Sequence, residues 1–438
     1  MSRSGVRSEP KDNSRPAIRH AEPLAVVGGP SYRRALTTGG LAVPTPDASL
    51  LAWRKEFPIL ENTCYMISNS LGAMPRGVRD SLKTFCDEWD TRGVRAWHEG
   101  WMDMVYETAD LYADVLGAPH GSVTMCQNVA VAQWIICSAL DFSGPRNKIV
   151  YTGMNFPSVM YIYEEQRRHG AEIEVVPSED GIGVDLDRLL EAIDETTLIV
   201  PVSHVLFRSA YIQDAEAIVK KAHAVGAMVV LDTYQSAGCV PVDLEGWDVD
   251  FCVGGSVKWL CGGPGAGYLY VRPDLQKKLE PSCTGWFAHS HPFEFVPGRI
   301  DYADMPRHFE SGTPNIPALY AARTGVRIVR QIGVERIRRN SLALTDRIVE
   351  RAREKGFDLT CPMDHEHRGG TVAFNVPNAK QVTAELLARE VIVDWRPKAG
   401  IRVSPHFYST FDECDRVVDE IQDILDSGAW ERHGHELY

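Results

Sequence analysis

The sequence predicts an α/β fold with a largely parallel sheet, followed by a smaller α+β domain. Between residues 120 and 271, short apolar runs alternate with segments of helical pattern, which is typical of strand–helix–strand units. Several apolar runs end in polar residues, as buried parallel strands do when their carboxyl ends form a site. Residues 371–427 follow a different order (strand, helix, strand, strand, helix) and predict the second domain.

Composition narrows the class of protein. The 438 residues carry a net charge of -13, with 44% hydrophobic and 24% charged residues, as in soluble globular proteins. The negative balance disfavours nucleic acid as a main partner. No apolar run approaches the roughly 18 residues that cross a bilayer, and residues 1–30 contain no apolar core like that of a secretory signal. The ten scattered cysteines lack zinc-binding spacing and are typical of reduced thiols, so we expect a cytoplasmic enzyme without a metal.

The N-terminal part begins with an arm, residues 1–46, that is rich in Pro, Ser, Gly and Arg and is expected to be disordered. A short helix is predicted from Ala48 to Phe57. The apolar run at 64–67 then breaks at Asn69 and Ser70. Two interpretations stay open: a plain strand and turn, or a site loop in which Asn69 and Ser70 hydrogen-bond a ligand.

The next elements are strands that end in polar breaks. Residues 123–142 begin with an apolar run, break at Gln127 and Asn128, and continue as an alanine-rich helix, whose first backbone N–H groups could bind phosphate. A strand over 148–151 breaks before Phe156, which could stack on a flat ring. The pattern continues with strands over 172–176 and 198–204, the latter ending in the polar residues Ser203 and His204, and with helices over 185–195 and 213–225.

The stretch 228–271 carries the strongest chemical signal. One apolar run delivers Asp232, and a second delivers Lys258 between Val257 and Trp259. A lysine in an apolar pocket has a lowered pKa and can attack carbonyls, so Lys258 is a candidate Schiff-base residue. Asp232 is a candidate partner for a pyridinium nitrogen. We expect these two residues to converge with the polar groups at the other strand ends, namely Asn128, Phe156 and His204.

The remaining segments are a long loop and the second domain. Residues 283–316 are irregular, and a loop of this length is usually functional or interfacial. Its histidines, His289 and His291, lack a carboxylate partner at motif spacing. Residues 316–355 predict one or two long helices. Arg402 lies between apolar neighbours in a predicted strand, either as an edge-strand arginine with its head in water or as a fork for a substrate carboxylate.

Several motifs together resemble those of pyridoxal-phosphate (PLP) enzymes of fold type I, in the class V aminotransferase group that includes kynureninases, cysteine desulfurases and isopenicillin epimerase-like proteins. The resemblance covers roughly residues 48–430. Its most specific pieces are Asp232-Thr233-Tyr234-Gln235-Ser236-Ala237-Gly238, Ser256-Val257-Lys258-Trp259, Gly262-Gly263-Pro264-Gly265, Phe309-Glu310-Ser311-Gly312-Thr313-Pro314-Asn315-Ile316, and Arg402-Val403-Ser404-Pro405-His406.

This resemblance implies an organisation for the chain. It implies a seven-stranded type of sheet between helices in a large PLP-binding domain, residues 91–325, and a small C-terminal domain, residues 326–438. Residues 47–90 would join the small domain. It also implies a homodimer with the active site at the subunit interface.

Residue roles follow from the same resemblance. Lys258 would form the internal aldimine, Asp232 would keep the pyridine nitrogen protonated, and Arg402 would bind the substrate α-carboxylate. The resemblance also implies contacts to the cofactor phosphate from Asn128, Val129 and Ser256, and from Thr313 across the dimer interface, with Trp286 nearby. Phe156 would stack on the cofactor ring, and Gln235 would lie at its phenolic oxygen with His204 nearby.

The resemblance leaves the reaction open. Kynureninase-like features predominate, among them Asn69-Ser70-Leu71-Gly72 and Gly285-Trp286-Phe287, and they favour a lyase that breaks a C–C or C–S bond through an external aldimine and a Cα carbanion. Val257, Val159 and Gln235 stand where kynureninases have tyrosine, aspartate and histidine. No cysteine lies in the segment 393–400 ahead of Arg402, where one desulfurase branch carries its persulfide. An aminotransferase or an epimerase shares the first steps and remains an alternative.

The sequence fits two other classes of protein less well, and it contains two arginines that bear on the substrate. The glycines at 262–267 do not form the dinucleotide motif GxGxxG, because Tyr268 stands where the last glycine belongs. A non-catalytic protein with this fold would not need Lys258. Arg208 and Arg396 either recognise a second acid group on the amino-acid substrate or are solvated surface arginines.

Overall fold

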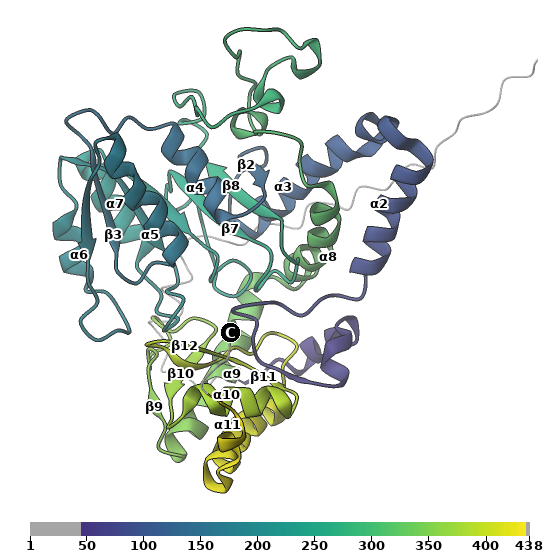
Figure 1. The fold of residues 1–438 in the computed structure, drawn as a ribbon, viewed down its shortest axis with the longest axis vertical. Helices are drawn as coiled ribbons and strands as arrows, with labels where there is room; N and C mark the ends of the chain where they lie inside the picture. The colour runs from purple at the N-terminus through teal and green to yellow at the C-terminus, as the bar shows by residue number, and fades with distance from the viewer. Residues whose placement is uncertain (1–44, 435–438) are drawn as a thin grey trace, which may run out of the picture.

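A seven-stranded sheet forms the centre of the large domain in the computed structural model, which describes residues 45–434 (Figure 1). The strand order is β2-β8-β7-β6-β5-β3-β4, and β8 alone runs antiparallel to both of its neighbours. The strands are β2 (Val123–Cys126), β3 (Lys148–Thr152), β4 (Glu172–Val176), β5 (Thr197–Ser203), β6 (Met228–Asp232), β7 (Phe251–Gly255) and β8 (Gly267–Val271). The large parallel portion confirms the fold predicted from the sequence. The predicted disordered arm lies outside the described residues up to position 44.

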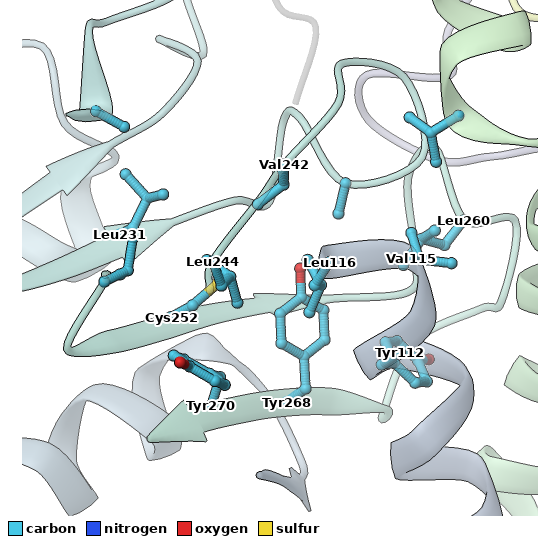
Figure 2. Packing of buried hydrophobic residues seen from close by; sticks show 14 of the residues in the cluster. Tyr112, Val115, Leu116, Leu231, Val242, Leu244, Cys252, Leu260, Tyr268 and Tyr270 are labelled. Carbon is cyan, nitrogen blue, oxygen red and sulfur yellow. The ribbon is translucent and has the colours of Figure 1, made fainter. Parts of the chain in front are cut away.

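Alternating side chains of each central strand pack into different layers. In β6, Val229 and Leu231 belong to the same hydrophobic cluster as Tyr112, whereas Val230 belongs to the cluster that contains Tyr163. Successive strand residues point to opposite faces, so an apolar run that is buried on both sides needs helices on both faces. Figure 2 shows part of the first cluster, with Tyr112 of a helix facing strand β8. The surrounding helices are α3 (Met102–Leu116), α4 (Val129–Ser138), α5 (Pro157–Glu164), α6 (Leu186–Ala192) and α7 (Ala215–Val225).

The segment before the sheet crosses from one domain to the other. It contains two 3-10 helices (Ala48–Glu56 and Pro58–Glu61), strand β1 (Cys64–Tyr65), helix α2 (Val78–Arg92), and two further turns of helix (Gly93–Arg95 and Trp97–Trp101). Strand β1 pairs in parallel with β11 (Val391–Ile392) of the C-terminal region. The apolar run at 64–67 therefore belongs structurally with residues far along the chain.

The C-terminal domain is built on a four-stranded antiparallel sheet in the order β12-β13-β10-β9 (Figure 1). The strands of this sheet are β9 (Asp358–Leu359), β10 (Val372–Asn375), β12 (Asp394–Arg396) and β13 (Gly400–Val403). The helices of the domain are α9 (Val334–Glu354), α10 (Ala379–Ala388), α11 (Phe411–Ser427) and a final 3-10 turn (Ala429–Arg432). Helix α8 (Ile316–Ile332) runs through the predicted boundary at residue 325, and it is followed by the C-cap residue Gly333, whose φ of 88° favours glycine. We propose that the domains divide there.

The long loop between β8 and α8 contains three short 3-10 turns, Trp286–Ala288, Pro292–Glu294 and Arg307–Phe309. Across residues 45–434, no helix combines the length and the apolar character that spanning a membrane requires.

Candidate active site

Polar residues follow one common edge of the large sheet. Strands β3, β5, β6 and β7 are mutually parallel, and β2 points the same way because it and β7 both oppose β8. Their carboxyl ends therefore lie along one edge, where α/β sheets bind ligands. Asp232 is the last residue of β6, and Asn128, Phe156, His204 and Lys258 follow the ends of the other four strands.

Lys258 lies in a partly closed aromatic environment. Its Nζ is 4.4 Å from the ring centroid of Tyr234 and 5.7 Å from that of Phe156. Burial lowers the pKa of Lys258 to about 8, and the nearby Asp232 carboxylate opposes that shift. A lysine with this pKa is a substantial source of neutral amine near neutral pH, which is the form that attacks a carbonyl.

Asp232 ends strand β6 and is only 5% exposed. Its Oδ1 accepts a hydrogen bond of 2.9 Å from the backbone N–H of Tyr234. Burial raises the pKa of Asp232 to about 6, with Tyr234 and Lys258 opposing the shift. Burial thus favours the neutral form of both groups. This is expected of a buried acid and a buried base at a site that binds a further charged group.

The loop after β1 packs against the backbone of the lysine. The N–H of Gly72 donates to the carbonyl of Val257 over 2.8 Å, and a Cβ at Gly72 would lie 2.1 Å from the carbonyl oxygen of Lys258. Only glycine allows this approach. Gln235 fixes the same loop, because its Nε2 donates to the carbonyl of Asn69 over 3.0 Å while its Oε1 accepts from the Trp259 indole over 3.1 Å.

The Asn69 side chain has buried polar atoms without partners. Asn69 is 1% exposed, and neither its Oδ1 nor its Nδ2 has a hydrogen-bond partner within the described residues. Leaving a buried polar group unsatisfied costs about 1–3 kcal/mol. A ligand that supplies a donor or an acceptor to this side chain would remove that cost, so Asn69 fits a site for a polar cofactor or substrate.

The start of α4 supplies backbone donors at the same sheet edge. Asn128 caps this helix by accepting from the N–H of Val131 over 3.1 Å, and Val129 is the first helical residue. A Cβ at Gly267 would lie 2.8 Å from the Asn128 backbone, so the β8 start holds this turn tightly. Helix starts bind phosphate through such N–H groups. The exposed Thr313 lines a small cavity near this turn together with Gln127 and Val131.

Arg402, on strand β13, has an internal carboxylate partner. Asp394 of the neighbouring strand lies directly opposite in the register, and Arg402 binds it with Nε, at 2.8 Å, and with Nη2. Nη1 of Arg402 donates to the carbonyl of Phe207 over 2.5 Å. The Phe207 ring meets the Phe156 ring edge-on at 5.2 Å. Arg402 is therefore connected through Phe207 to the ring that faces Lys258.

Four residues that the sequence analysis expected to contact the cofactor or the substrate have other neighbours or other positions in the structure. Ser203 is paired in register with Asp232, so His204 emerges on the opposite face, where its ring lies 5.4 Å from that of Trp247. The hydroxyl of Ser256 donates to the carbonyl of Gly263 over 2.9 Å. Ser70 is half-buried in the loop beside Asn69. Trp286 lies on the long loop and packs against Phe287, Phe293 and Phe295.

Two residues were missed by reasoning from the sequence. Tyr234 lies beside Lys258, and Asp394 binds Arg402. Tyr234 could have been found, since it lies two residues after Asp232 at a strand end. Asp394 could not, because its contact depends on the hairpin register.

Comparison with known proteins identifies the family. Residues 64–417 match the model of the family described as aminotransferase class-V. The chain belongs to the class V aminotransferase family. It is 30% identical over 406 residues to a kynureninase from Pseudomonas fluorescens, covering 89% of this chain and 95% of that protein. It is also 30% identical over 372 residues to the uncharacterized aminotransferase YcbU from Bacillus subtilis, covering 84% and 96%.

Solved structures agree with the class V fold. A cysteine desulfurase from Thermococcus onnurineus superposes with a TM-score of 0.77 at 24% identity, covering 88% of this chain and 100% of that one. The cystine C–S lyase C-DES, in complex with cysteine persulfide, superposes with a TM-score of 0.77 at 18% identity, covering 84% and 99%. The protein is a PLP-dependent enzyme of this family, and Lys258, Asp232 and the unsatisfied Asn69 amide fit that cofactor.

Proposed function

We propose that this class V enzyme is a lyase that breaks a C–C or C–S bond in the side chain of an amino acid, as a kynureninase-like protein. The observation that carries the proposal is the connection of Arg402 through Phe207 and Phe156 to Lys258. This joins a carboxylate-binding group from one domain to an amine of lowered pKa from the other. The similarity to kynureninases over most of the chain supports the lyase outcome.

The cofactor half of the site would be formed by the large sheet. PLP, when bound, withdraws electrons from the Cα of an amino acid, which makes bonds there and further along the side chain easier to break. We assign Lys258 to covalent attachment and to moving a proton at Cα. Asp232 would hold a proton on the pyridine nitrogen, Phe156 would cover the ring, and the first N–H groups of α4, at Asn128 and Val129, would bind the phosphate. The sequence-based assignments of Gln235, Ser256, Thr313 and Trp286 remain predictions, and we leave His204 out because of the face on which it lies.

The substrate half would be formed by Arg402 with Asn69 and Ser70. A guanidinium has five N–H groups, and Arg402 uses one on each of its three nitrogens for Asp394 and Phe207. One N–H therefore remains on each terminal nitrogen for a further acceptor, such as a carboxylate oxygen. Asp394 therefore orients Arg402 without using up its capacity for a substrate carboxylate.

We also propose a cytoplasmic homodimer. All ten cysteines are free thiols, as expected in a reducing compartment. The long loop exposes large apolar side chains, including Phe293 (50% exposed) and Phe295 (73% exposed). Trp286 contacts both rings, and exposed apolar side chains of this kind mark interaction surfaces that a second copy would cover.

An aminotransferase is the second candidate, favoured by the similarity to YcbU. A persulfide-forming desulfurase is disfavoured by the cysteines. Cys86 is the exposed one among residues 45–434, and it lies on α2, while burial raises the pKa of Cys361 above its ordinary value. A buried thiol with a raised pKa is a poor nucleophile.

Absorbance spectroscopy and product analysis test the proposal. We expect the purified protein to show an absorbance band at the violet edge of the visible spectrum, and borohydride to fix the cofactor on the peptide that contains Lys258. Lys258→Ala should lose both the band and at least about 10³-fold in turnover, whereas Lys220→Ala, on helix α7, should lose neither. A native protein without the band would contradict the proposal. Products from kynurenine, cysteine conjugates and alanine with a keto acid would separate the reactions, because turnover of alanine alone would make the protein an aminotransferase.

A further inference from the structure

Arg208 is a half-buried cation without a carboxylate partner among residues 45–434. Its guanidinium carbon lies 5.2 Å from the ring centroid of Phe207, and its Nη1 lies 3.9 Å from the sulfur of Met154. Within residues 45–434, no Asp or Glu oxygen lies within 4.0 Å of the Arg208 nitrogens. A phenyl ring and a thioether replace little of the hydration that a guanidinium loses on partial burial.

The neighbours of Arg208 connect it to the active site. The Phe207 ring meets the Phe156 ring at 5.2 Å, and Phe156 faces Lys258. The carbonyl of Phe207 accepts from Arg402. Met154 precedes Phe156 by two residues on the turn between β3 and α5. Arg208 thus belongs to the loop that also anchors the proposed α-carboxylate arginine.

The charges in this region leave room for two anionic groups. Asp394 supplies one negative charge and is shared by Arg402 and by Arg396, whose Nη2 lies 3.2 Å from it. These three residues leave one excess positive charge, which the α-carboxylate of an amino acid would balance. Arg208 adds a second excess positive charge. One α-carboxylate cannot balance both charges, so a second anionic group is needed.

We infer that the substrate is an amino acid whose side chain carries an acidic group, a carboxylate or a sulfinate, and that Arg208 binds this group. The inference rests on the proposed function, because it takes Arg402 as the group that binds the α-carboxylate. An acidic group placed at Arg208 would be held on the Phe156 and Phe207 side of the site. Arg208 is therefore a determinant of substrate specificity, while Lys258 and Asp232 act on the part common to all amino acids.

Binding of simple carboxylates to the PLP-loaded enzyme tests this assignment without requiring turnover. Isothermal titration calorimetry would compare succinate with butyrate and glutarate with valerate, pairs that differ by one carboxylate. We expect at least one dicarboxylate to bind about tenfold more tightly than its matched monocarboxylate, as for one added charge-assisted contact. In Arg208→Met the ratio should fall to about one, with monocarboxylate binding unchanged, and Arg208→Lys should restore part of it.

Arg188→Met, which changes an exposed arginine on α6, should keep the wild-type ratio. Wild-type enzyme without a preference for either dicarboxylate would overturn the inference, as would an Arg208→Met variant that keeps the full preference. The PLP absorbance band reports separately on the proposed function and on the folding of each variant. A wild-type enzyme with a normal PLP band but no preference for dicarboxylates would contradict only the role of Arg208. A wild-type enzyme without the PLP band would contradict the proposed function.

Discussion

The two halves of the candidate site differ in how their charges are compensated. On the large sheet, Asp232 and Lys258 are both displaced toward neutrality by burial, and the amide of Asn69 has no hydrogen-bond partner within the described residues. In the C-terminal domain, Arg402 already has the Asp394 carboxylate and the Phe207 carbonyl. The sheet half thus depends on a ligand to complete its interactions, whereas the arginine of the C-terminal half is already oriented by internal partners before a ligand binds.

This difference distinguishes two ways of preparing a binding group. A polar group without an internal partner contributes most to the free energy of ligand binding, but it lowers the stability of the protein without the ligand. A group held by an internal partner loses little mobility on binding, because its geometry is already fixed. We expect substitutions in the sheet half to affect ligand binding foremost, and substitutions in the C-terminal half to affect folding as well.

The largest effect on stability is expected at the Arg402–Asp394 pair. Both side chains are below 10% exposure, at 4% and 9%. Removing one partner from a buried ion pair costs about 3–5 kcal/mol. Arg402→Met should therefore lower the free energy of unfolding by about 3 kcal/mol, since Arg396 still partly compensates Asp394, and the urea midpoint would measure the loss.

Arg402→Lys is the matched control, because it keeps the charge but not the two-pronged contact, and its loss should be smaller. An unchanged urea midpoint in Arg402→Met would show that the C-terminal half is not stabilised by this pair.

The second effect concerns pH and the sheet half alone. Because burial lowers the pKa of Lys258 to about 8, the amine gains its reactive neutral form as the pH rises to that value. The rate at which apoprotein attaches PLP should therefore rise about tenfold per pH unit below pH 8 and level off above it. Stopped-flow absorbance would follow the attachment. A rate that continues to rise beyond pH 10 would indicate a lysine of ordinary pKa and would contradict the contrast between the halves.

The smallest effect is expected at Asn69. Replacing its buried, unsatisfied amide by the similarly sized apolar side chain in Asn69→Leu should raise the free energy of unfolding of the apoprotein by about 1 kcal/mol. The same change should weaken the binding of PLP or of the amino acid, because a polar contact is lost. Thermal unfolding of the apoprotein would measure the change in stability, and equilibrium dialysis of PLP would measure the change in binding. A variant that is destabilised and still binds its ligands fully would show that Asn69 serves folding instead.

The sequence predicted the sheet edge better than the contacts around it. Apolar runs that end in Asp232 and near Lys258 carry local information, and the parallel topology brings such ends together, so the convergence could be predicted. The face on which a side chain emerges depends on register, and for that reason His204 could be placed near the strand end but not on a face. Arg402 was predicted as a carboxylate fork, yet its pairing with Asp394 depends on the β12–β13 register, and the two hydrogen bonds of Gln235 depend on segments far apart in the sequence.

The segment 64–72 has a mechanical consequence. At one end, β1 is hydrogen-bonded to β11 of the C-terminal domain, and at the other, Gly72 is hydrogen-bonded to the peptide just before Lys258. It acts as a short tether between the two bodies, with the Asn69 carbonyl held to Gln235 midway. A rotation of the C-terminal domain would pull on the peptide that carries the lysine. Closure of the domains over a substrate would thus be transmitted to the reactive amine through the backbone.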